Sequence, residues 1–354
     1  MENIRSYIDA FSELGGFLTQ FITAKNTAQY SSNTLHNLYF NKLDKQLKLA
    51  QQNNAWFTQE NLLFTLKYWS KALNKKNLTN WLKNQNLQTS KSKKIALITA
   101  GNIPIVGFHD FISILISGHI VLIKQSSKDM QLLPLLAKYL QAVLPEFKHK
   151  ILFAENKLSN FDAVIATGSN NTARYFEYYF KNKPSIIRKN KNSVAVIKGD
   201  ESQQDLMSLS EDIFRYFGLG CRSVSKLYVP ENYNFNNIFN AVYHKHKIIE
   251  NCKYANNYDY NKAVYLMSEF NFLDNGFLMI KEDKAYCSPI ATVFYEHYKT
   301  LDQLRTRINR DSDKIQCVVA SNFDQNDIAF GKAQLPDLHD YADGVNTLEF
   351  LANL

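Results

Sequence analysis

The stretch IALITAGN, residues 95–102, decides the fold, because it is a short continuous apolar run that ends in a glycine-containing turn. A helical pattern follows over 104–117, and a second apolar run follows at 119–123. Continuous apolar runs that alternate with helices are typical of parallel strands buried on both faces of a sheet. The stretch therefore predicts the start of a parallel sheet.

The same alternation continues further along the chain. Helices are expected at 128–143 and 172–180, and further apolar runs stand at 151–153, 163–166 and 193–197. This pattern predicts a doubly wound α/β region, and sheets of this kind bind ligands beyond the carboxyl ends of their strands.

A second α/β lobe is expected after residue 217. Its strand signals stand at 227–229, 263–267, 277–280, 291–295 and 317–320, with helices expected at 235–249 and 300–309. Residues 1–90 show the apolar spacing of amphipathic helices, which we expect to pack on the first lobe. The predicted organisation is thus a helical region at 1–90, α/β lobes at 91–217 and 218–330, and a tail at 331–354 that no pattern places.

The cysteine pattern argues against a metal site and against a disulfide framework. The four cysteines stand far apart at 221, 252, 287 and 317, without a CxxC pair or a zinc-like Cys/His spacing. The longest apolar run, 112–123, is interrupted by polar residues and is shorter than the about 20 residues of a membrane span. The N-terminus lacks the pattern of a signal peptide, so we expect a cytoplasmic protein.

The composition is that of a globular chain. It holds 354 residues, of which 45% are hydrophobic and 21% charged, with a formal net charge of +8. The lysines are scattered between apolar runs and no RNA-binding signature occurs, so nucleic acid is not expected as a partner. Phosphorylated small molecules, such as coenzyme A or a dinucleotide, suit the same sign of charge.

Polar residues gather at the expected carboxyl ends of the strands in the first lobe. Asn102 follows the first strand, Lys124 ends the second, and Gly168-Ser169 opens the helix after the fourth. A Gly-Ser turn at a helix N-terminus presents amide groups to a phosphate, although Ser169 also suits a simple N-cap and Lys124 a solvated surface position. The GxGxxG fingerprint is absent, and the three loops together favour a dinucleotide site.

Cys221 stands in FGLGCRSVSK, residues 217–226, directly after two closely spaced glycines and before the strand signal at 227–229. Glycines let the backbone approach a bound substrate, and a thiolate is a strong nucleophile. The alternative is a buried structural cysteine in a turn. Cys221 is thus a candidate nucleophile.

These motifs, in this order, resemble the aldehyde dehydrogenase superfamily. Within it, the chain resembles the acyl-CoA reductases of the LuxC type, the fatty-acid reductase family. The resemblance runs from about residue 90 to the end, and more loosely through the N-terminal helices. It implies an aldehyde dehydrogenase-like α/β fold with two Rossmann-type lobes, 91–217 binding the dinucleotide and 218–330 carrying the catalytic cysteine.

Position by position, the resemblance implies the following roles. Cys221 matches the catalytic nucleophile, and Asn102 matches the asparagine that stabilises the oxyanion. Lys124 matches the lysine that contacts the adenosine ribose or its phosphate. Gly168 and Ser169 match the turn against the pyrophosphate.

The chain departs from the superfamily pattern at three places. Ala173 stands where a glycine is usual, and 285–289 lacks the expected ribose-binding glutamate. The segment 186–192 contains no carboxylate where hydrolytic members keep the base that activates water. An enzyme that must protect an acyl-cysteine from water gains by lacking that base, so the departure favours a CoA-dependent reductase.

The resemblance therefore implies an acylating aldehyde dehydrogenase that reduces a fatty acyl-CoA, or an acyl-protein thioester, to the aldehyde. NADPH is the expected cofactor, with NADH as the alternative, and CoA is the leaving group. An acyl-transfer enzyme is a candidate partner, and a homo-oligomer is expected. Two alternatives remain open: a CoA-independent aldehyde dehydrogenase or other reductase of the superfamily, and a non-catalytic partner that retains the fold.

Overall fold

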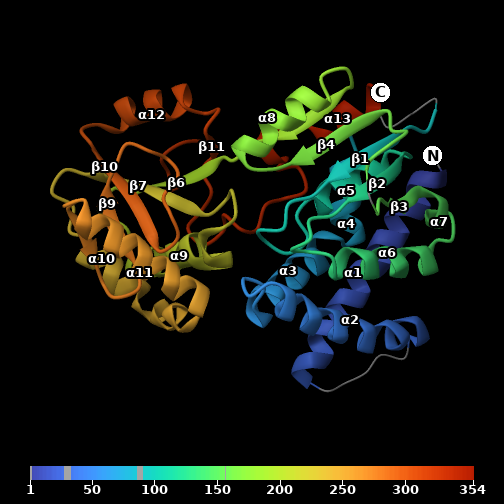
Figure 1. The fold of residues 1–354 in the computed structure, drawn as a ribbon, viewed down its shortest axis with the longest axis horizontal. Helices are drawn as coiled ribbons and strands as arrows, with labels where there is room; N and C mark the ends of the chain where they lie inside the picture. Colours follow the sequence, from blue (N-terminus) through green and yellow to red (C-terminus); the bar gives the residue numbers. More distant parts are fainter. Residues whose placement is uncertain (1, 28–32, 86–90, 156) are drawn as a thin grey trace. The chain divides into compact units, whose positions relative to one another are not determined.

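The computed structural model describes residues 2–27, 33–85, 91–155 and 157–354. The chain forms two compact units, one made of Met1–Lys189 with Asp337–Leu354 and the other of Asn190–Pro336. Figure 1 traces the chain through both. These bounds differ from the expected division at 217/218 and 330/331, and each unit has its own sheet.

The first unit is built on a five-stranded sheet in the order β3-β2-β1-β4-β5, with every neighbouring pair parallel. Its strands are β1 (Lys94–Ile98), β2 (Ile120–Lys124), β3 (Ile151–Phe153), β4 (Ala163–Thr167) and β5 (Ser185–Arg188). Because the first strand lies in the centre and later strands are added on both sides, the sheet is doubly wound, as expected. The strand β5 is one that the sequence analysis did not anticipate.

Helices cover both faces of this sheet because successive strand residues point to opposite sides. On one face, Ile95 and Leu97 belong to the large apolar cluster of the unit. On the other face, Ala96 packs in a smaller cluster with Phe176 and Phe180. The helices that connect the strands are α5 (Phe108–Ile116), α6 (Leu132–Val143), α7 (Phe147–Lys150) and α8 (Asn170–Tyr179).

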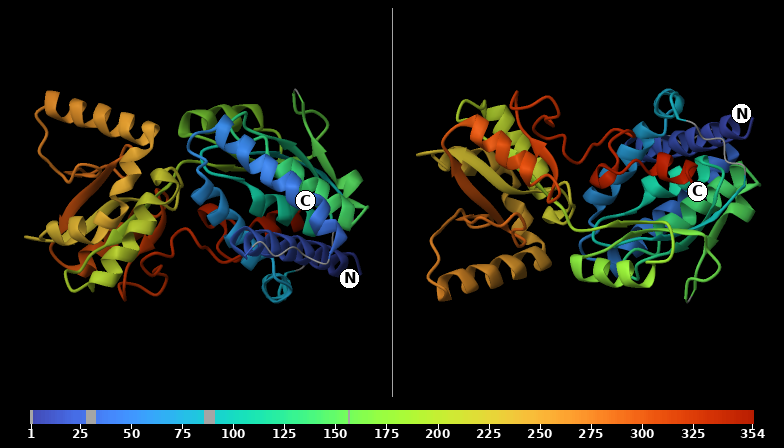
Figure 2. Two further views of the ribbon diagram at one scale, coloured as in Figure 1. Left: turned by 90° about the horizontal axis from the view of Figure 1, so that it is seen from below. Right: turned by 90° about the horizontal axis from the view of Figure 1, so that it is seen from above.

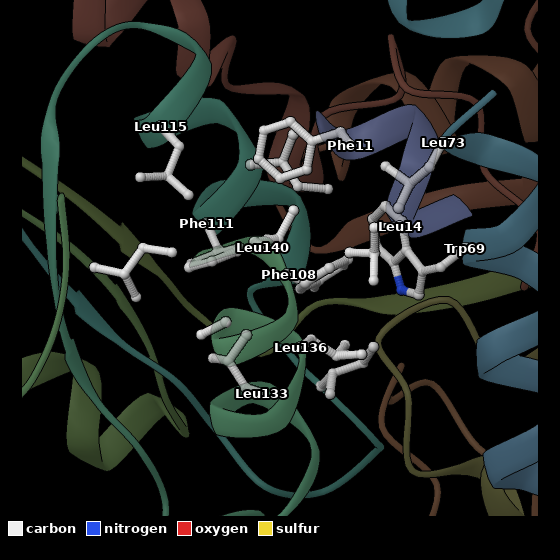
Figure 3. Packing of buried hydrophobic residues seen from close by; sticks show 14 of the residues in the cluster. Phe11, Leu14, Trp69, Leu73, Phe108, Phe111, Leu115, Leu133, Leu136 and Leu140 are labelled. Carbon is white, nitrogen blue, oxygen red and sulfur yellow. The ribbon is translucent and has the colours of Figure 1, made fainter. Parts of the chain in front are cut away.

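The N-terminal helices belong to this unit. They are α1 (Glu2–Thr27), α2 (Thr34–Asn53), α3 (Gln59–Ala72) and α4 (Lys75–Leu82), and residues 86–90 lie outside the described residues. Helix α1 packs against α3, α5 and α6 (Figure 2). Figure 3 shows the packing, in which Phe11 and Leu14 of α1 lie near Trp69 and the α5 ring of Phe108. The Trp69 and Phe108 ring centroids lie 4.8 Å apart, edge to face, a favourable aromatic geometry.

The tail returns to the first unit and ends there in helix α13 (Thr347–Ala352), after the short 3-10 turn η3 (Ala342–Gly344). Leu348 and Leu351 are fully buried in the large cluster. A buried ion pair between Arg188 and Asp110 joins the tail to the unit, because the guanidinium also donates to the hydroxyl of Thr347. These contacts place the segment that the sequence pattern left open.

The second unit is built on a six-stranded sheet in the order β11-β6-β7-β10-β9-β8. Its strands are β6 (Asn192–Val196), β7 (Val224–Pro230), β8 (Phe272–Asp274), β9 (Met279–Glu282), β10 (Thr292–Tyr298) and β11 (Ile315–Val319). Only the β8–β9 pair is antiparallel among these described strands. Its helical segments are α9 (Gln203–Phe214), η1 (Arg215–Gly218), α10 (Asn236–Val242), η2 (Tyr243–Glu250), α11 (Cys252–Met267) and α12 (Leu301–Arg310). The α/β class and the largely parallel sheets are thereby confirmed.

Two expectations about strands were wrong. The apolar run at 193–197 forms β6, which pairs with β7 and β11 in the second sheet and not with the first sheet. The run at 263–267, expected to be a strand, forms the last turns of α11. The buried side chains of α11 follow the helical spacing and include Tyr254, Tyr258 and Tyr265. This helical pattern over the whole segment, and not the short apolar run at its end, determines the structure. Among the described residues, no helix is long and apolar enough to cross a membrane.

Candidate active site

One edge of the first sheet gathers four of the five predicted site residues. Strands β2, β1 and β4 are adjacent and parallel, so their carboxyl ends lie at the same edge. Asn102 lies in the turn after β1, Lys124 is the last residue of β2, and Gly168 and Ser169 directly follow β4. The sheet therefore brings these residues to the side on which doubly wound sheets bind ligands.

The turn that carries Asn102 is packed tightly against the loop after β2. A Cβ atom added to Gly101 would lie 2.7 Å from the Ser126 hydroxyl and 2.9 Å from Lys128 Cβ, so no larger residue fits there. The Asn54 side chain donates to the carbonyl of Gly101 at 3.3 Å. Asn102 itself is exposed next to this anchored backbone.

A buried carboxylate holds the far side of the same turn. The backbone N–H of Ile105 donates to Asp129 Oδ2 at 2.6 Å, and Ile105 has a φ of 49°. A β-branched residue rarely adopts this left-handed conformation, so the bond to Asp129 offsets backbone strain. Burial raises the pKa of Asp129 to about 6, although the Ile105 N–H opposes that shift. Its Oδ1 has no hydrogen-bond partner among the described residues.

The Gly168-Ser169 turn opens helix α8. Ser169 is the N-cap, and its hydroxyl accepts the backbone N–H of Thr172 at 3.3 Å. The N–H of Gly168 donates to the carbonyl of Arg188 on β5 at 3.3 Å, so this amide is engaged within the sheet. Ala173, at the position where the superfamily usually has glycine, is fully buried.

The groups at this edge fit an anionic dinucleotide. Helix α8 begins at Asn170, and the N-terminus of a helix carries a partial positive charge that attracts phosphate. Lys124 adds a cation at the end of β2, where its ammonium donates to the carbonyl of Glu155 at 3.3 Å. No group of three or more His, Cys, Asp and Glu that could hold a metal ion occurs within the described ranges.

Cys221 lies in the second unit, in the turn between η1 and β7, and its side chain is exposed. Tyr216, Phe217 and Gly218 precede it with φ values of 55°, 58° and 75°. Two aromatic residues in the left-handed region are strained, at about 1–3 kcal/mol each, and burial of both rings holds them there. The chain therefore bends sharply just before the thiol.

The backbone of Cys221 is held after this bend. The hydroxyl of Ser193 donates to the carbonyl of Cys221 at 3.0 Å, and the N–H of Ser223 donates to the carbonyl of Gly220, also at 3.0 Å. Ser193 is fully buried at the start of β6, and its hydroxyl also lies 3.0 Å from Cys317 Sγ. The arrangement presents an accessible thiol on a fixed backbone, which is what a nucleophile requires and what a buried structural cysteine does not show.

The segment that lacks the hydrolytic base has a structural role in the first unit. Arg188, at the end of β5, is buried and ion-paired with Asp110, with an Nη2–Oδ1 distance of 2.6 Å. Burial alone would raise the pKa of Asp110, but the charge of Arg188 outweighs it and holds the pKa below its usual value. Arg188 is thus engaged in the core of the first unit.

Sequence reasoning missed the residues that hold these turns. Asp129, Asp212 and Ser193 carry no motif, and their roles depend on partners far away in the chain. A signal existed for Asp110, because it stands in the otherwise largely apolar helix α5. A carboxylate in such a position indicates a buried partner.

The solved structures that are similar to this chain include several aldehyde dehydrogenases. The enzyme from Mycobacterium tuberculosis complexed with NAD+ aligns with a TM-score of 0.60 at 14% identity, over 89% of this chain and 74% of that one. The NAD+ complex from Bacillus cereus aligns with a TM-score of 0.56 at 12% identity, over 90% and 76%. Aldehyde dehydrogenase 21 from Physcomitrella patens, in complex with succinate, aligns with a TM-score of 0.59 at 12% identity, over 92% and 77%. At these identities the likeness shows a shared fold.

The sequence comparisons identify the family. None of the curated proteins matches the chain. The family model described as "Acyl-CoA reductase (LuxC)" matches residues 16–292, which is most of the chain. The resemblance inferred from the motifs is thereby confirmed, and the protein belongs to the acyl-CoA reductase (LuxC) family, whose members are oxidoreductases acting on aldehydes or acyl-CoA, here with an aldehyde dehydrogenase fold.

Proposed function

We propose that the protein reduces a fatty acyl-CoA, or an acyl-protein thioester, to the aldehyde with NADPH through an acyl-Cys221 intermediate. The observation that carries the proposal is the turn around Cys221, where an exposed thiol stands on a backbone fixed by Ser193 and by the bond between Ser223 and Gly220. Family membership supports the choice of a thioester substrate.

In the first half of the reaction, the Cys221 thiolate attacks the carbonyl carbon of the thioester. The new C–S bond turns the carbonyl oxygen into an oxyanion, which we assign to the side-chain amide of Asn102 and the backbone N–H of Cys221. A well-placed donor of this kind contributes about 3–4 kcal/mol to the transition state. The oxyanion then collapses, the C–S bond to CoA breaks, and CoA leaves as a thiolate that takes up a proton.

In the second half, the carbonyl carbon of the acyl-Cys221 thioester accepts a hydride, which gives the anion of a thiohemiacetal. Bound NADPH, for which NADH is the alternative, would supply that hydride. The anion then collapses: the C–S bond breaks, Cys221 returns as a thiolate, and the free aldehyde leaves. We assign Lys124, Gly168 and Ser169 to cofactor binding, and their chemistry at the sheet edge supports that role.

The acyl-enzyme is either reduced to the aldehyde or hydrolysed, and hydrolysis is fast only where a base activates water. The segment 186–192 offers no carboxylate to activate water, and its Arg188 is committed to Asp110. General-base assistance typically contributes about 10²–10⁴-fold to such a step. An acyl-Cys221 without it lives longer, which supports reduction over hydrolysis.

Acyl labelling tests the proposal. Purified protein is incubated with radiolabelled fatty acyl-CoA in the absence of NADPH, and the label is followed on denaturing gels and by peptide mapping. We expect about one acyl group per chain on Cys221, released as aldehyde when NADPH is added. Labelling of the Cys221→Ala variant to the wild-type level would refute the proposal.

The alternative, a CoA-independent aldehyde dehydrogenase, predicts a different pattern of turnover. Such an enzyme would oxidise an aldehyde with NAD+ or NADP+ in the absence of CoA. We expect aldehyde oxidation by this protein to require free CoA, because the acyl group must leave Cys221 to a thiol. Assays with and without CoA separate the two activities.

A further inference from the structure

A short segment at the end of the second unit lies against the Cys221 turn. This segment, residues 330–334, is called the strap below. Phe330 and Ala333 of the strap are buried in the apolar cluster that also contains Leu209 and Ile213 of helix α9. The strap is therefore part of the packed core of its unit, although it follows the last strand of the sheet.

Asp212 of α9 fastens the strap to the helix. Its Oδ2 accepts the backbone N–H of Gly331 at 2.6 Å, and its Oδ1 accepts that of Ala333 at 2.9 Å. The Asp212 side chain is fully buried. Both carboxylate oxygens are thus used, and each charged acceptor makes a stronger bond than a neutral one would.

The geometry at Gly331 makes the fit between strap and helix close. Gly331 has a φ of 80°, and an added Cβ would lie 3.1 Å from Ser208 Cβ and 3.2 Å from the Ser208 carbonyl oxygen. Any side chain there would therefore be strained and would push the strap away from α9.

The same strap binds the two residues that follow Cys221. Arg222 Nε donates to the carbonyl of Ala333 at 2.5 Å, and Gln334 Nε2 donates to the hydroxyl of Ser223 at 3.1 Å. Ala333 thus connects Asp212, through its N–H, with Arg222, through its carbonyl. The chain of contacts runs from α9 through the strap to the turn that presents the thiol.

We propose that Asp212 is a positioning residue for the acyl-transfer step: through the strap it sets the orientation of the Cys221 turn. This inference rests on the proposed role of Cys221 as nucleophile. Ser193 holds the carbonyl of Cys221 from one side, and the strap holds Arg222 and Ser223 from the other. With both sides held, the thiol and the Cys221 N–H keep a fixed direction, and misplacement by about 1 Å can cost about 10²-fold in rate.

The replacement Asp212→Asn tests this role, because an amide keeps the shape but offers one acceptor oxygen in place of two. We expect the single-turnover rate of acyl transfer from acyl-CoA to fall about tenfold or more, with KM for acyl-CoA changed by less than about twofold. Asp205→Asn is the matched control. Asp205 belongs to the exposed capping box at the start of the same helix, so its loss weakens α9 without touching the strap.

A second pair of variants tests the link from the strap to the turn. Gln334→Ala removes the contact with Ser223 and leaves the buried Asp212 in place, so it remains informative if Asp212→Asn does not fold. We expect a smaller fall, about threefold or more, in the same rate. Gln204→Ala, at an exposed position of α9, should keep the wild-type rate.

A chemical readout separates this inference from the proposed function. The rate of alkylation of Cys221 by iodoacetamide is followed by peptide mass spectrometry, with the exposed Cys252 of α11 as internal standard. We expect the ratio of the two rates to change about threefold or more in Asp212→Asn and Gln334→Ala and to stay constant in the two controls. Unchanged acylation rates and an unchanged ratio in the folded variants would overturn the inference. Acylation of Cys221→Ala would overturn the proposed function, while the alkylation ratio would still test the positioning role.

Discussion

The turns that carry Asn102 and Cys221 share a strained backbone but are held in different ways. Each contains a non-glycine residue in the left-handed region. A buried aspartate, Asp129, accepts a backbone N–H of the Asn102 turn directly, whereas the buried Asp212 accepts two backbone N–H groups of the strap, which in turn contacts Arg222 and Ser223. Burial raises the pKa of both Asp129 and Asp212 to about 6. The difference lies in the bonds: Asp212 uses both oxygens, whereas Asp129 uses one, and its Oδ1 has no partner within the described ranges.

The two aspartates therefore differ in how far hydrogen bonds compensate their burial. A buried carboxylate with two backbone donors recovers more of its desolvation cost than one with a single donor. The strap beside the Cys221 turn has the two-bonded aspartate, and Cys221 has a covalent role in the proposed reaction. The Asn102 turn, held by Asp129 and Asn54, carries only a hydrogen-bond donor in that reaction.

The largest expected effect is on the Cys221 turn. Cys221→Ala removes the nucleophile, and we expect aldehyde formation from acyl-CoA to fall by about 10⁴-fold or more, because no acyl-enzyme forms. Steady-state assays of NADPH oxidation, with aldehyde trapped and quantified, measure this. The melting temperature of Cys221→Ala should be nearly that of wild type because the side chain is exposed. Activity of Cys221→Ala within tenfold of wild type would show that Cys221 is not the covalent nucleophile.

A third buried carboxylate, Asp110, provides a contrast, because it is neutralised by Arg188 instead of by backbone groups. Arg188→Met leaves Asp110 buried without its cation, and we expect a loss of about 3–5 kcal/mol in unfolding free energy. Urea unfolding at pH 7 measures it. The double variant Asp110→Asn/Arg188→Met should recover a large part of the loss. Equal stability of the single and double variants would show that the charge of Asp110 is not what matters.

The next effect concerns the Asn102 turn. Asn102→Ala removes the proposed oxyanion donor, and we expect kcat for acyl-CoA reduction to fall by about 10²–10³-fold with little change in stability. The exposed Asn256→Ala on α11 is the control. A change confined to KM would assign Asn102 to substrate binding and would contradict its proposed role as oxyanion donor.

The smallest effect is the pH dependence of stability contributed by Asp129. The pKa of Asp129 is about 6 in the folded state, above the ordinary value of 3.8. Between pH 3.8 and about pH 6, Asp129 therefore holds a proton in the folded state and has released it in the unfolded state. Stability is therefore lost as the pH rises from about 4 to about 6, by at most about 3 kcal/mol at about 1.4 kcal/mol per pH unit.

The variant Asp129→Asn removes this titration. We expect the unfolding free energy of wild type relative to Asp129→Asn to decrease over that pH interval and to level off above it. Urea unfolding of both proteins between pH 4 and pH 7.5 measures the difference, and other titrating groups cancel. The exposed Asp313→Asn should give a flat difference. A difference that rises with pH would reverse the assignment for Asp129.

Much of the architecture could be read from local patterns. The apolar runs at 95–98, 119–123 and 163–166 are strands β1, β2 and β4, because a strand buried on both faces needs apolar side chains throughout. The polar residues that follow them, such as Asn102 and Lys124, come to one edge because parallel strands share their direction. The position of Cys221 directly before β7 was read in the same way.

The sequence by itself thus determined the α/β class, the central strands β1, β2 and β4 of the first sheet and the choice of candidate residues, since these depend on side chains close together in the chain. Only the tertiary structure decided which sheet takes β6, that 263–267 is helical, and where the tail packs. It also decided that Asp129 holds the Asn102 turn and that Asp212 holds the strap, because Asp212 and Gly331 are brought together by the fold alone. The physical reason is that burial and hydrogen-bond partnership belong to the packed chain, whereas apolar periodicity is a local property.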